Sequence, residues 1–167
     1  MEATMMKRCK ECSSEMVISR EAYRYNESGL PNVVLKDVEI RRCPNCGTQE
    51  VPLPRVAELH RAIAVVLVHK AARFLGAEVR YLRKYMGWSG VDFASHMGVN
   101  PETVSRWEND KEVISSQSDR LLRLIVVRGW PVEDYSVDDL TKIDDRKDPP
   151  PVEVELRVRD RRWQSAA

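Results

Sequence analysis

The feature that most constrains this chain is a pair of cysteine motifs, each with two residues between its cysteines. The first is CKEC at Cys9–Cys12 and the second is CPNCG at Cys43–Gly47, and no other cysteines occur in the 167 residues. Two such turns complete a tetrahedron of sulfurs at about 2.3 Å around a zinc ion. The sequence therefore predicts one structural Zn²⁺ per chain, with no position left for a catalytic water. Its four ligands would be Cys9, Cys12, Cys43 and Cys46.

Two other uses of these cysteines stay open in the sequence. A redox C-x-x-C pair belongs at a helix start within a βαβ unit, and neither motif has that setting. Four thiolates also suit an iron–sulfur cluster, although nothing else in the chain points to one. The N-terminus lacks the apolar core and cleavage site of a secretory signal. We therefore expect a cytoplasmic protein, in which structural disulfides are rare.

The segment between the two cysteine pairs is predicted to form a β-hairpin. Strand-like residues flank the sequence NESGLPN, whose asparagine, serine, glycine and proline favour a turn. Such a hairpin returns Cys43 toward Cys9. Residues 1–54 are thus predicted to be a small zinc-ribbon-like β module, with so little core that the metal supplies most of its stability.

Residues 55–75 are predicted to form one long connecting helix. Apolar residues recur there at helical spacing from Val56 to Phe74. The longest apolar run, AIAVVLV, is too short to cross a bilayer, so we expect no membrane partner. His60 and His69 are nine residues apart on this helix, which is not the spacing of a ligand pair. We expect both to serve packing or the surface.

Residues 76–128 are predicted to be an all-α domain with clear helix start and stop signals. Gly87, Gly98 and Gly129 follow helical segments, as helix-ending glycines do. Each of the last three helices begins with a capping pair: Ser89 with Asp92, Asn100 with Pro101, and Ser116 with Asp119.

The last segment, residues 129–167, differs in composition from the helical domain before it. It is acidic and rich in proline up to PPP, which predicts a linker. The following VEVELRVRD alternates apolar and charged residues, which predicts a β-strand. A lone strand needs a partner, and we expect the hairpin or a second subunit to supply it. The predicted fold class is α+β: a zinc-ribbon-like module, a helical domain and a C-terminal strand.

The order of helices in residues 76–128 favours a helix-turn-helix unit, with a scaffold helix, a short second helix and a recognition helix. Phe93, Ala94 and Trp107 are placed to face the core. Residues 55–128 carry 12 Lys and Arg against 8 Asp and Glu, a charge compatible with binding nucleic acid. The alternative is a helical bundle that uses the same apolar spacing for packing alone.

The stretch LRKYMGWSGVDFASHMGVNPETVSRWEN resembles the Xre, phage-repressor-like helix-turn-helix. With two C-x-x-C pairs and the ELHRAIA helix before it, the chain up to about residue 128 is similar to the YgiT-type zinc finger proteins, which include the MqsA antitoxins. The resemblance implies zinc binding by the four cysteines, base contact by Arg106 and a second base-reading position at Glu102. Xre domains usually have glutamine where this chain has Gly90, and commonly an amide at the position of Glu102. The resemblance therefore does not imply an operator sequence.

Six residues are predicted to contact DNA. Four are on the outward face of the recognition helix, and two lysines nearby would contact phosphate. They are Arg106, Glu102, Thr103, Asn109, Lys84 and Lys111. In Xre-like units the residues that match Arg83 and Glu108 form a bridge between scaffold and recognition helices, so the resemblance implies that bridge here.

We expect a sequence-specific transcriptional repressor of antitoxin type. It would bind a palindromic double-stranded DNA operator as a homodimer, because one helix-turn-helix makes too few base contacts for tight specificity. Leu121, Leu124, Ile125 and the terminal strand are candidates for the dimer contact. By resemblance, the zinc module would bind a protein toxin.

Two other classes of function are alternatives to this one. The first is a stand-alone zinc-containing transcriptional regulator with no toxin partner. The second is a redox enzyme that acts through C-x-x-C. No nucleophile–base pattern, phosphate-binding glycine loop or paired-carboxylate motif occurs in the sequence, so we expect that the chain is not an enzyme.

Overall fold

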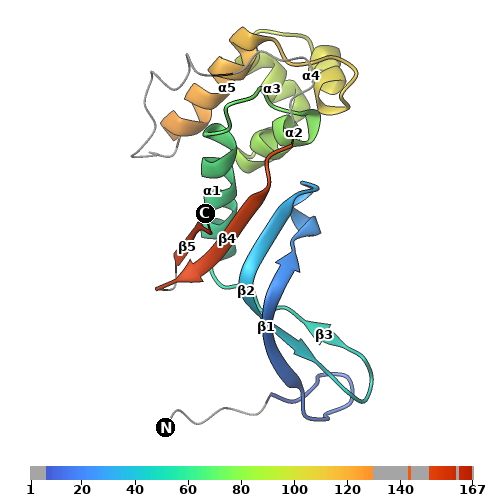
Figure 1. Cartoon of the computed structure of the whole chain (residues 1–167). Helices are drawn as coiled ribbons and strands as arrows, with labels where there is room; N and C mark the ends of the chain where they lie inside the picture. Colours follow the sequence, from blue (N-terminus) through green and yellow to red (C-terminus); the bar gives the residue numbers. More distant parts are fainter. Residues whose placement is uncertain (1–6, 130–142, 144–150, 161, 167) are drawn as a thin grey trace.

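The fold is mixed α+β, as predicted, and the molecule is elongated. Helices lie at one end and the tip of a long hairpin at the other (Figure 1). The computed structural model describes residues 7–129, 143, 151–160 and 162–166. The acidic linker predicted after Gly129 falls almost entirely outside the described residues.

Five strands and five α-helices occur in these residues. The strands are β1 (Val17–Arg24), β2 (Val33–Arg42), β3 (Gln49–Glu50), β4 (Val154–Arg159) and β5 (Arg162–Ser165). The helices are α1 (Val56–Val68), α2 (Gly76–Tyr85), α3 (Gly90–Met97), α4 (Pro101–Glu108) and α5 (Ser116–Gly129). A 3-10 turn, η1 (Asn26–Ser28), connects β1 to β2.

All five strands belong to one sheet, which joins the two ends of the chain. Its order is β1-β2-β4-β5, and β3 pairs with the far end of β2. The β1–β2 hairpin is antiparallel, whereas β4 lies parallel to β2 with Leu35 opposite Leu156. The sequence left two partners open for the C-terminal strand, the hairpin or a second subunit, and in the structure it pairs with the hairpin. A parallel pair requires a long crossover connection, and here that connection contains every α-helix of the described residues.

A β-bulge in β2 keeps its apolar side chains on the same face of the sheet. Leu35 and Val38 are both buried, although they are three residues apart. Between them Asp37 has a φ of 55°, and the register shifts there. Arg20 holds the bulge by donating to the backbone oxygen of Asp37 at 3.2 Å. The extra residue lets both halves of the strand turn apolar side chains to the same face.

Helix α1 ends earlier than its apolar spacing suggests. The prediction of one helix over residues 55–75 is wrong, because α1 stops at Val68. The guanidinium of Arg123 in α5 binds the carbonyl oxygens at this point: Val68 at 2.8 Å, Lys70 at 2.6 Å and Ala72 at 2.9 Å. These bonds satisfy the carbonyls that a continuing helix would use, and they place a cation at the negative end of the helix dipole.

Arg123 is buried, and so is its carboxylate partner. Its Nε donates to Asp119 Oδ1 at 2.6 Å, and the side chains are 1% and 0% exposed. The other Asp119 oxygen accepts from the backbone N–H of Phe74 at 2.7 Å. The prediction that Asp119 completes a capping box with Ser116 is therefore wrong. Instead, Ser115 Oγ accepts from the N–H of Ser118 at the start of α5.

A second buried ion pair fixes the start of α2. Lys70 Nζ lies 2.9 Å from Glu78 Oε2, and the two side chains are 4% and 5% exposed. The same carboxylate accepts from the N–H of Leu75 at 2.8 Å, which caps the helix. The two buried pairs together determine the path of the loop from α1 to α2. One continuous apolar core then includes residues of the sheet, such as Leu35, and of the helices, such as Phe93.

We predict that Arg123→Met lowers the free energy of unfolding by about 3–5 kcal/mol, because it leaves Asp119 charged and unpaired in the core. Urea unfolding followed by far-ultraviolet circular dichroism measures the change. Arg128→Met is the matched control, since Arg128 is on the same helix and exposed. Equal losses in the two variants would contradict a special role for Arg123.

Candidate metal centre and candidate nucleic-acid interface

The four cysteines meet at the tip of the hairpin. All four Sγ atoms lie within 4.8 Å of one another. Cys9 and Cys46 are 3.5 Å apart, and Cys12 and Cys43 are 3.3 Å apart. These separations are far longer than the roughly 2.0 Å of a disulfide, and the cysteines are free thiols. They approach the sulfur spacing of about 3.8 Å that a tetrahedral zinc–thiolate site requires, so the donor set fits a metal ion.

The two C-x-x-C turns have the same backbone geometry. In each turn the carbonyl oxygen of the first cysteine accepts a hydrogen bond from the N–H of the residue four positions later. The N–H of the same cysteine donates to the carbonyl oxygen of the residue five positions later. The four bonds are Ser13 N to Cys9 O, Gly47 N to Cys43 O, Cys9 N to Ser14 O and Cys43 N to Thr48 O, at 2.8–3.0 Å. Two equivalent turns facing each other can present two sulfurs each to one point.

The residue after each pair adopts a left-handed conformation. Gly47 has a φ of 75° and Ser13 a φ of 60°. Glycine favours such a conformation in the sequence, whereas the serine at position 13 carries no such signal. Only the equivalence of the two turns reveals its role.

Hydroxyl groups next to Cys12 and Cys46 favour the thiolate form of these two residues, whereas burial raises the pKa of Cys43 to about 11. Hydrogen bonding to Ser14 lowers the pKa of Cys12 to about 6. The hydroxyl of Thr48, 3.2 Å from the sulfur, lowers the pKa of Cys46. Thiolates are the species that bind metal, so these contacts suit a metal centre.

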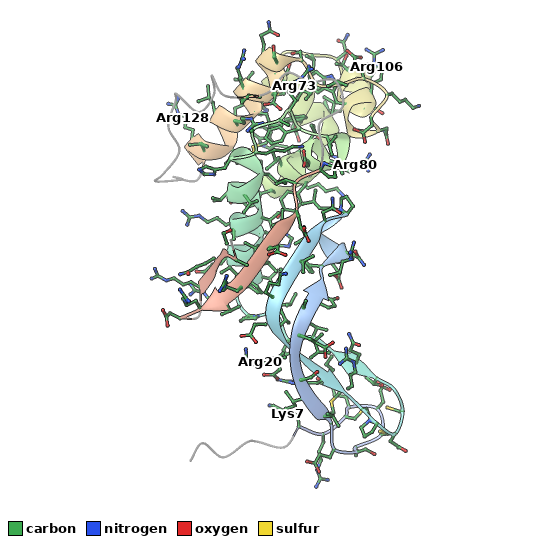
Figure 2. All side chains as sticks on the ribbon, in the orientation of Figure 1. Lys7, Arg20, Arg73, Arg80, Arg106 and Arg128 are labelled. Carbon is green, nitrogen blue, oxygen red and sulfur yellow. The ribbon has the colours of Figure 1, made fainter. Side chains whose placement is uncertain are left out.

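The metal centre lies outside the main core. Among the hydrophobic residues that the structure describes, Cys9 and Cys43 form a small cluster with Met16 and Cys12, separate from the main core. Lys7 and Arg20 mark this end of the molecule, and Arg106 marks the opposite end (Figure 2). With so few apolar contacts, the tip would gain much of its local stability from a bound metal ion.

We predict that Cys43→Ser abolishes binding of one metal ion per chain and exposes the hairpin tip to proteolysis, because three thiolates cannot complete the tetrahedron. Metal content by mass spectrometry and limited proteolysis measure this, and the helical end should keep its circular dichroism. Asn45→Ser, in the same turn but not a ligand, is the control. Retained metal stoichiometry in Cys43→Ser would contradict the assignment.

The second candidate site is at the helical end, where α3 and α4 pack together. The capping box at Ser89 and Asp92 is confirmed, with Ser89 Oγ accepting from the N–H of Asp92 at 3.1 Å. Gly98 ends α3 with a φ of 65°, also as predicted. The side chains expected to face the core, Phe93, Ala94 and Trp107, are buried, and so are Met97 and Val104.

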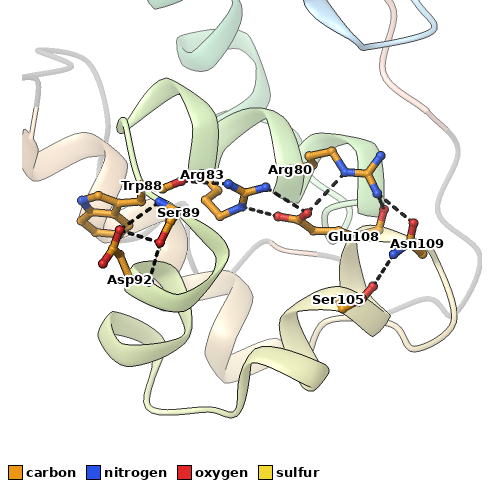
Figure 3. Close-up of polar contacts among 8 residues, drawn as sticks. All are labelled: Arg80, Arg83, Trp88, Ser89, Asp92, Ser105, Glu108 and Asn109. Atoms are coloured by element: carbon orange, nitrogen blue, oxygen red, sulfur yellow. Dashed lines mark hydrogen bonds and ion pairs between the residues drawn. The ribbon is translucent and has the colours of Figure 1, made fainter.

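Glu108 joins α4 to α2 through a mostly buried ion pair (Figure 3). Arg83 Nε lies 2.5 Å from Glu108 Oε1, and the side chains are 13% and 10% exposed. The bridge implied by the resemblance is therefore present. Arg83 also donates to the backbone oxygen of Trp88 at 2.8 Å, so one guanidinium fixes α2, the α2–α3 loop and α4. The hydrogen bond to Glu108 raises the pKa of Arg83.

Asn109 has a structural role that the sequence analysis did not anticipate. Its Oδ1 accepts from Arg80 at 2.9 Å, and its Nδ2 donates to the backbone oxygen of Ser105 at 2.7 Å. Both ends of the amide are thus engaged at the C-terminus of α4. Each bond uses one of the two hydrogen-bonding positions at its end of the amide, and together they fix the orientation of the Asn109 side chain.

The other residues predicted to contact DNA are not all close together. Arg106 and Glu102 are exposed on α4, and Thr103, half-buried, accepts from Arg106 Nη2 at 3.2 Å. Lys111 is exposed just after α4. Lys84 instead lines a pocket between α1, α2 and the β1–β2 turn. Arg106 pairs with Glu112 at 3.0 Å, but both side chains are about half exposed, so this contact is weak.

We predict that Arg83→Ala and Glu108→Ala each lower stability and show a coupling of roughly 0.5–3 kcal/mol in a double-mutant cycle. Thermal unfolding of the four proteins measures it. The control cycle is Arg106 with Glu112, an ion pair whose side chains are 53% and 50% exposed, for which we expect no measurable coupling. Additive effects of the Arg83 and Glu108 substitutions would show that this bridge does not stabilise the fold.

Comparisons of the chain with models of known protein families, with curated proteins and with solved structures found no significant match. No helix in the described residues is long and apolar enough to cross a membrane. The function of the two sites therefore has to be argued from their geometry and chemistry.

Proposed function

We propose that this protein is a sequence-specific DNA-binding transcriptional repressor of antitoxin type, with a structural zinc centre. The observation that carries the proposal is the exposed face of α4. This face presents Arg106 and Glu102 on a helix whose opposite side is anchored by Val104 and Trp107. Such a helix is suited to a major groove, because its reading side chains project while its backbone is held rigidly.

The chemistry of this face suits base recognition. The planar guanidinium of Arg106 can donate two parallel hydrogen bonds to a guanine edge, and the carboxylate of Glu102 can accept from the amino group of cytosine. Arg106 must first leave Glu112. Because that pair is exposed, the exchange costs little free energy.

The zinc centre would stabilise the hairpin tip without taking part in a reaction, since four thiolates leave no open coordination position. The tip projects away from the helices (Figure 1), which leaves it accessible to a protein partner while DNA is bound at the other end. In the antitoxin form of the proposal, this partner is the toxin. The stand-alone regulator is the alternative, and an adjacent reading frame for a small basic ribonuclease-like protein would favour the antitoxin.

A dimer would double the number of base contacts on a palindromic operator. Leu121 and Leu124 on α5 are 39% and 42% exposed, so they can still contribute to a subunit interface. The C-terminal strand already pairs with β2 inside the chain, which leaves its partner β5, rather than β4, at the edge of the sheet.

We predict that Arg106→Ala abolishes preference for the operator and leaves weak, salt-sensitive binding to any duplex. The operator is obtained by selecting duplexes from a random pool with the wild-type protein. Titrations of this duplex and of a scrambled one at two salt concentrations then measure the preference. A lost bidentate contact is worth about 1–3 kcal/mol, so the preference should fall about 5- to 150-fold per half-site.

Two matched variants control this experiment. Arg106→Lys keeps the charge but loses the planar fork, so it should retain non-specific binding without restoring the preference. Lys111→Ala should weaken both duplexes alike and reduce the salt dependence. If Arg106→Ala kept the wild-type preference, α4 would not read the sequence and the helices would form only a structural bundle.

A further inference from the structure

A pocket lies where the sheet meets the helices. It has a volume of about 630 Å³, and its walls come from the β1–β2 turn, α1 and α2. Cavities of roughly 300–1,000 Å³ are typical of small-molecule sites. Neither the metal centre nor the exposed face of α4 contributes a residue to it.

Aromatic rings from two helices line this pocket. Tyr81 and Tyr85 are one helical turn apart on α2, so they lie on the same side of that helix. His60 of α1 stacks on Tyr81, with the ring centroids 5.9 Å apart and the ring planes 24° from parallel. Such rings favour a planar ligand, because a flat molecule can stack on them or meet them edge to face.

The polar atoms of His60 and Tyr81 are satisfied by one another and by Tyr25. The Tyr81 hydroxyl donates to the backbone oxygen of His60 at 3.0 Å and lies 2.9 Å from His60 Nδ1. His60 Nε2 lies 3.3 Å from the hydroxyl of Tyr25. His60 therefore donates through Nδ1 and accepts through Nε2, as a neutral ring, since burial lowers its pKa. A ligand against these rings has no polar atom of theirs left to satisfy.

The charged side chains of the lining balance one another. Two are acidic, Glu27 and Glu58, and two are basic, Arg61 and Lys84. Glu27, Arg61 and Lys84 are exposed, so water screens their charges. The pocket therefore has no net charge to attract an ion. A charged ligand would lose part of its hydration against the rings without a matching gain, which favours an uncharged one.

One buried side-chain oxygen of the lining has no hydrogen-bond partner among the described residues. It is Oε2 of Glu58, whose Oε1 forms an ion pair with Arg55. A carboxylate oxygen only accepts hydrogen bonds, so it suits a ligand N–H rather than a ligand acceptor. The Glu58 side chain is 34% exposed, and rotation about its terminal bond is soft, so this oxygen can turn toward the pocket.

We propose that this pocket binds a small, uncharged, planar heteroaromatic molecule that carries a ring N–H. Its rings would lie against Tyr81 and Tyr85, and its N–H would donate to Glu58. Two fused rings fit within the volume and leave room for a substituent or for water. This site is separate from the proposed DNA-reading face, and its ligand does not depend on DNA binding.

The test compares indole with benzofuran, in which an oxygen replaces the N–H, and with indole-3-carboxylate, which adds a negative charge. Titrations followed by the amide NMR chemical shifts of the whole chain at pH 7.5 measure the affinities, with no DNA present. We expect indole to bind with a Kd below about 1 mM, as a ligand of its size can. Benzofuran should bind about tenfold more weakly, because it cannot donate to Glu58. Tighter binding of indole-3-carboxylate than of indole would overturn the uncharged class of ligand.

Two variants and two matched controls locate the site. Glu58→Met removes the acceptor and should weaken indole to the level of benzofuran, whereas Glu153→Met, at an exposed position outside the pocket, should not. Ala57→Trp, at an exposed position on the pocket wall, should fill the space and abolish binding of both probes. Ala71→Trp, at an exposed alanine outside the pocket, should leave binding unchanged.

Three results would overturn the proposal. The first is that indole does not bind, and the second is that it binds no more tightly than benzofuran. The third is that its binding survives Ala57→Trp. Because none of these measurements involves DNA, failure of the DNA-binding proposal would leave them standing.

Discussion

The arrangement of the helices depends on the buried guanidinium of Arg123. Removing such a group from water costs several kcal/mol unless its donors are matched, and here they are matched by Asp119 and by three carbonyls beyond the end of α1. These bonds hold only if α1 stops at Val68 and the chain turns back toward α5. The side chain of Arg123 therefore determines where α1 ends and how α5 packs against it.

The two ends of the molecule are held together by different forces. At the helical end, a continuous apolar core extends into the sheet, and its buried charges are paired. At the hairpin tip, Met16 is the one described apolar residue outside the cysteines in their cluster, so a bound metal ion would have to replace burial there. The C-terminal strand β4 pairs with the half of β2 nearest the helices, so it connects the hairpin to the helical end.

Helix α2 both supports α4 and lines the pocket that it forms with α1 and the β1–β2 turn. Arg80 and Arg83 bind Glu108, so this helix positions the exposed face of α4. Tyr81 and Lys84, which are adjacent to those arginines in the sequence, line the pocket. A displacement of α2 would thus alter both the pocket and the support of α4.

The sequence alone determined the features that depend on neighbouring residues. The C-x-x-C spacing, the Ser89 capping box and the alternation of the last strand are short-range patterns, and each predicts its local structure. Tertiary structure decided where α1 ends, what Asp119 binds and which strand β4 joins. Arg123 and the carbonyl of Lys70 are 53 residues apart, and β4 follows β2 by more than a hundred. Such contacts leave no periodic signal in the chain, because they depend on which surfaces meet once the core has formed.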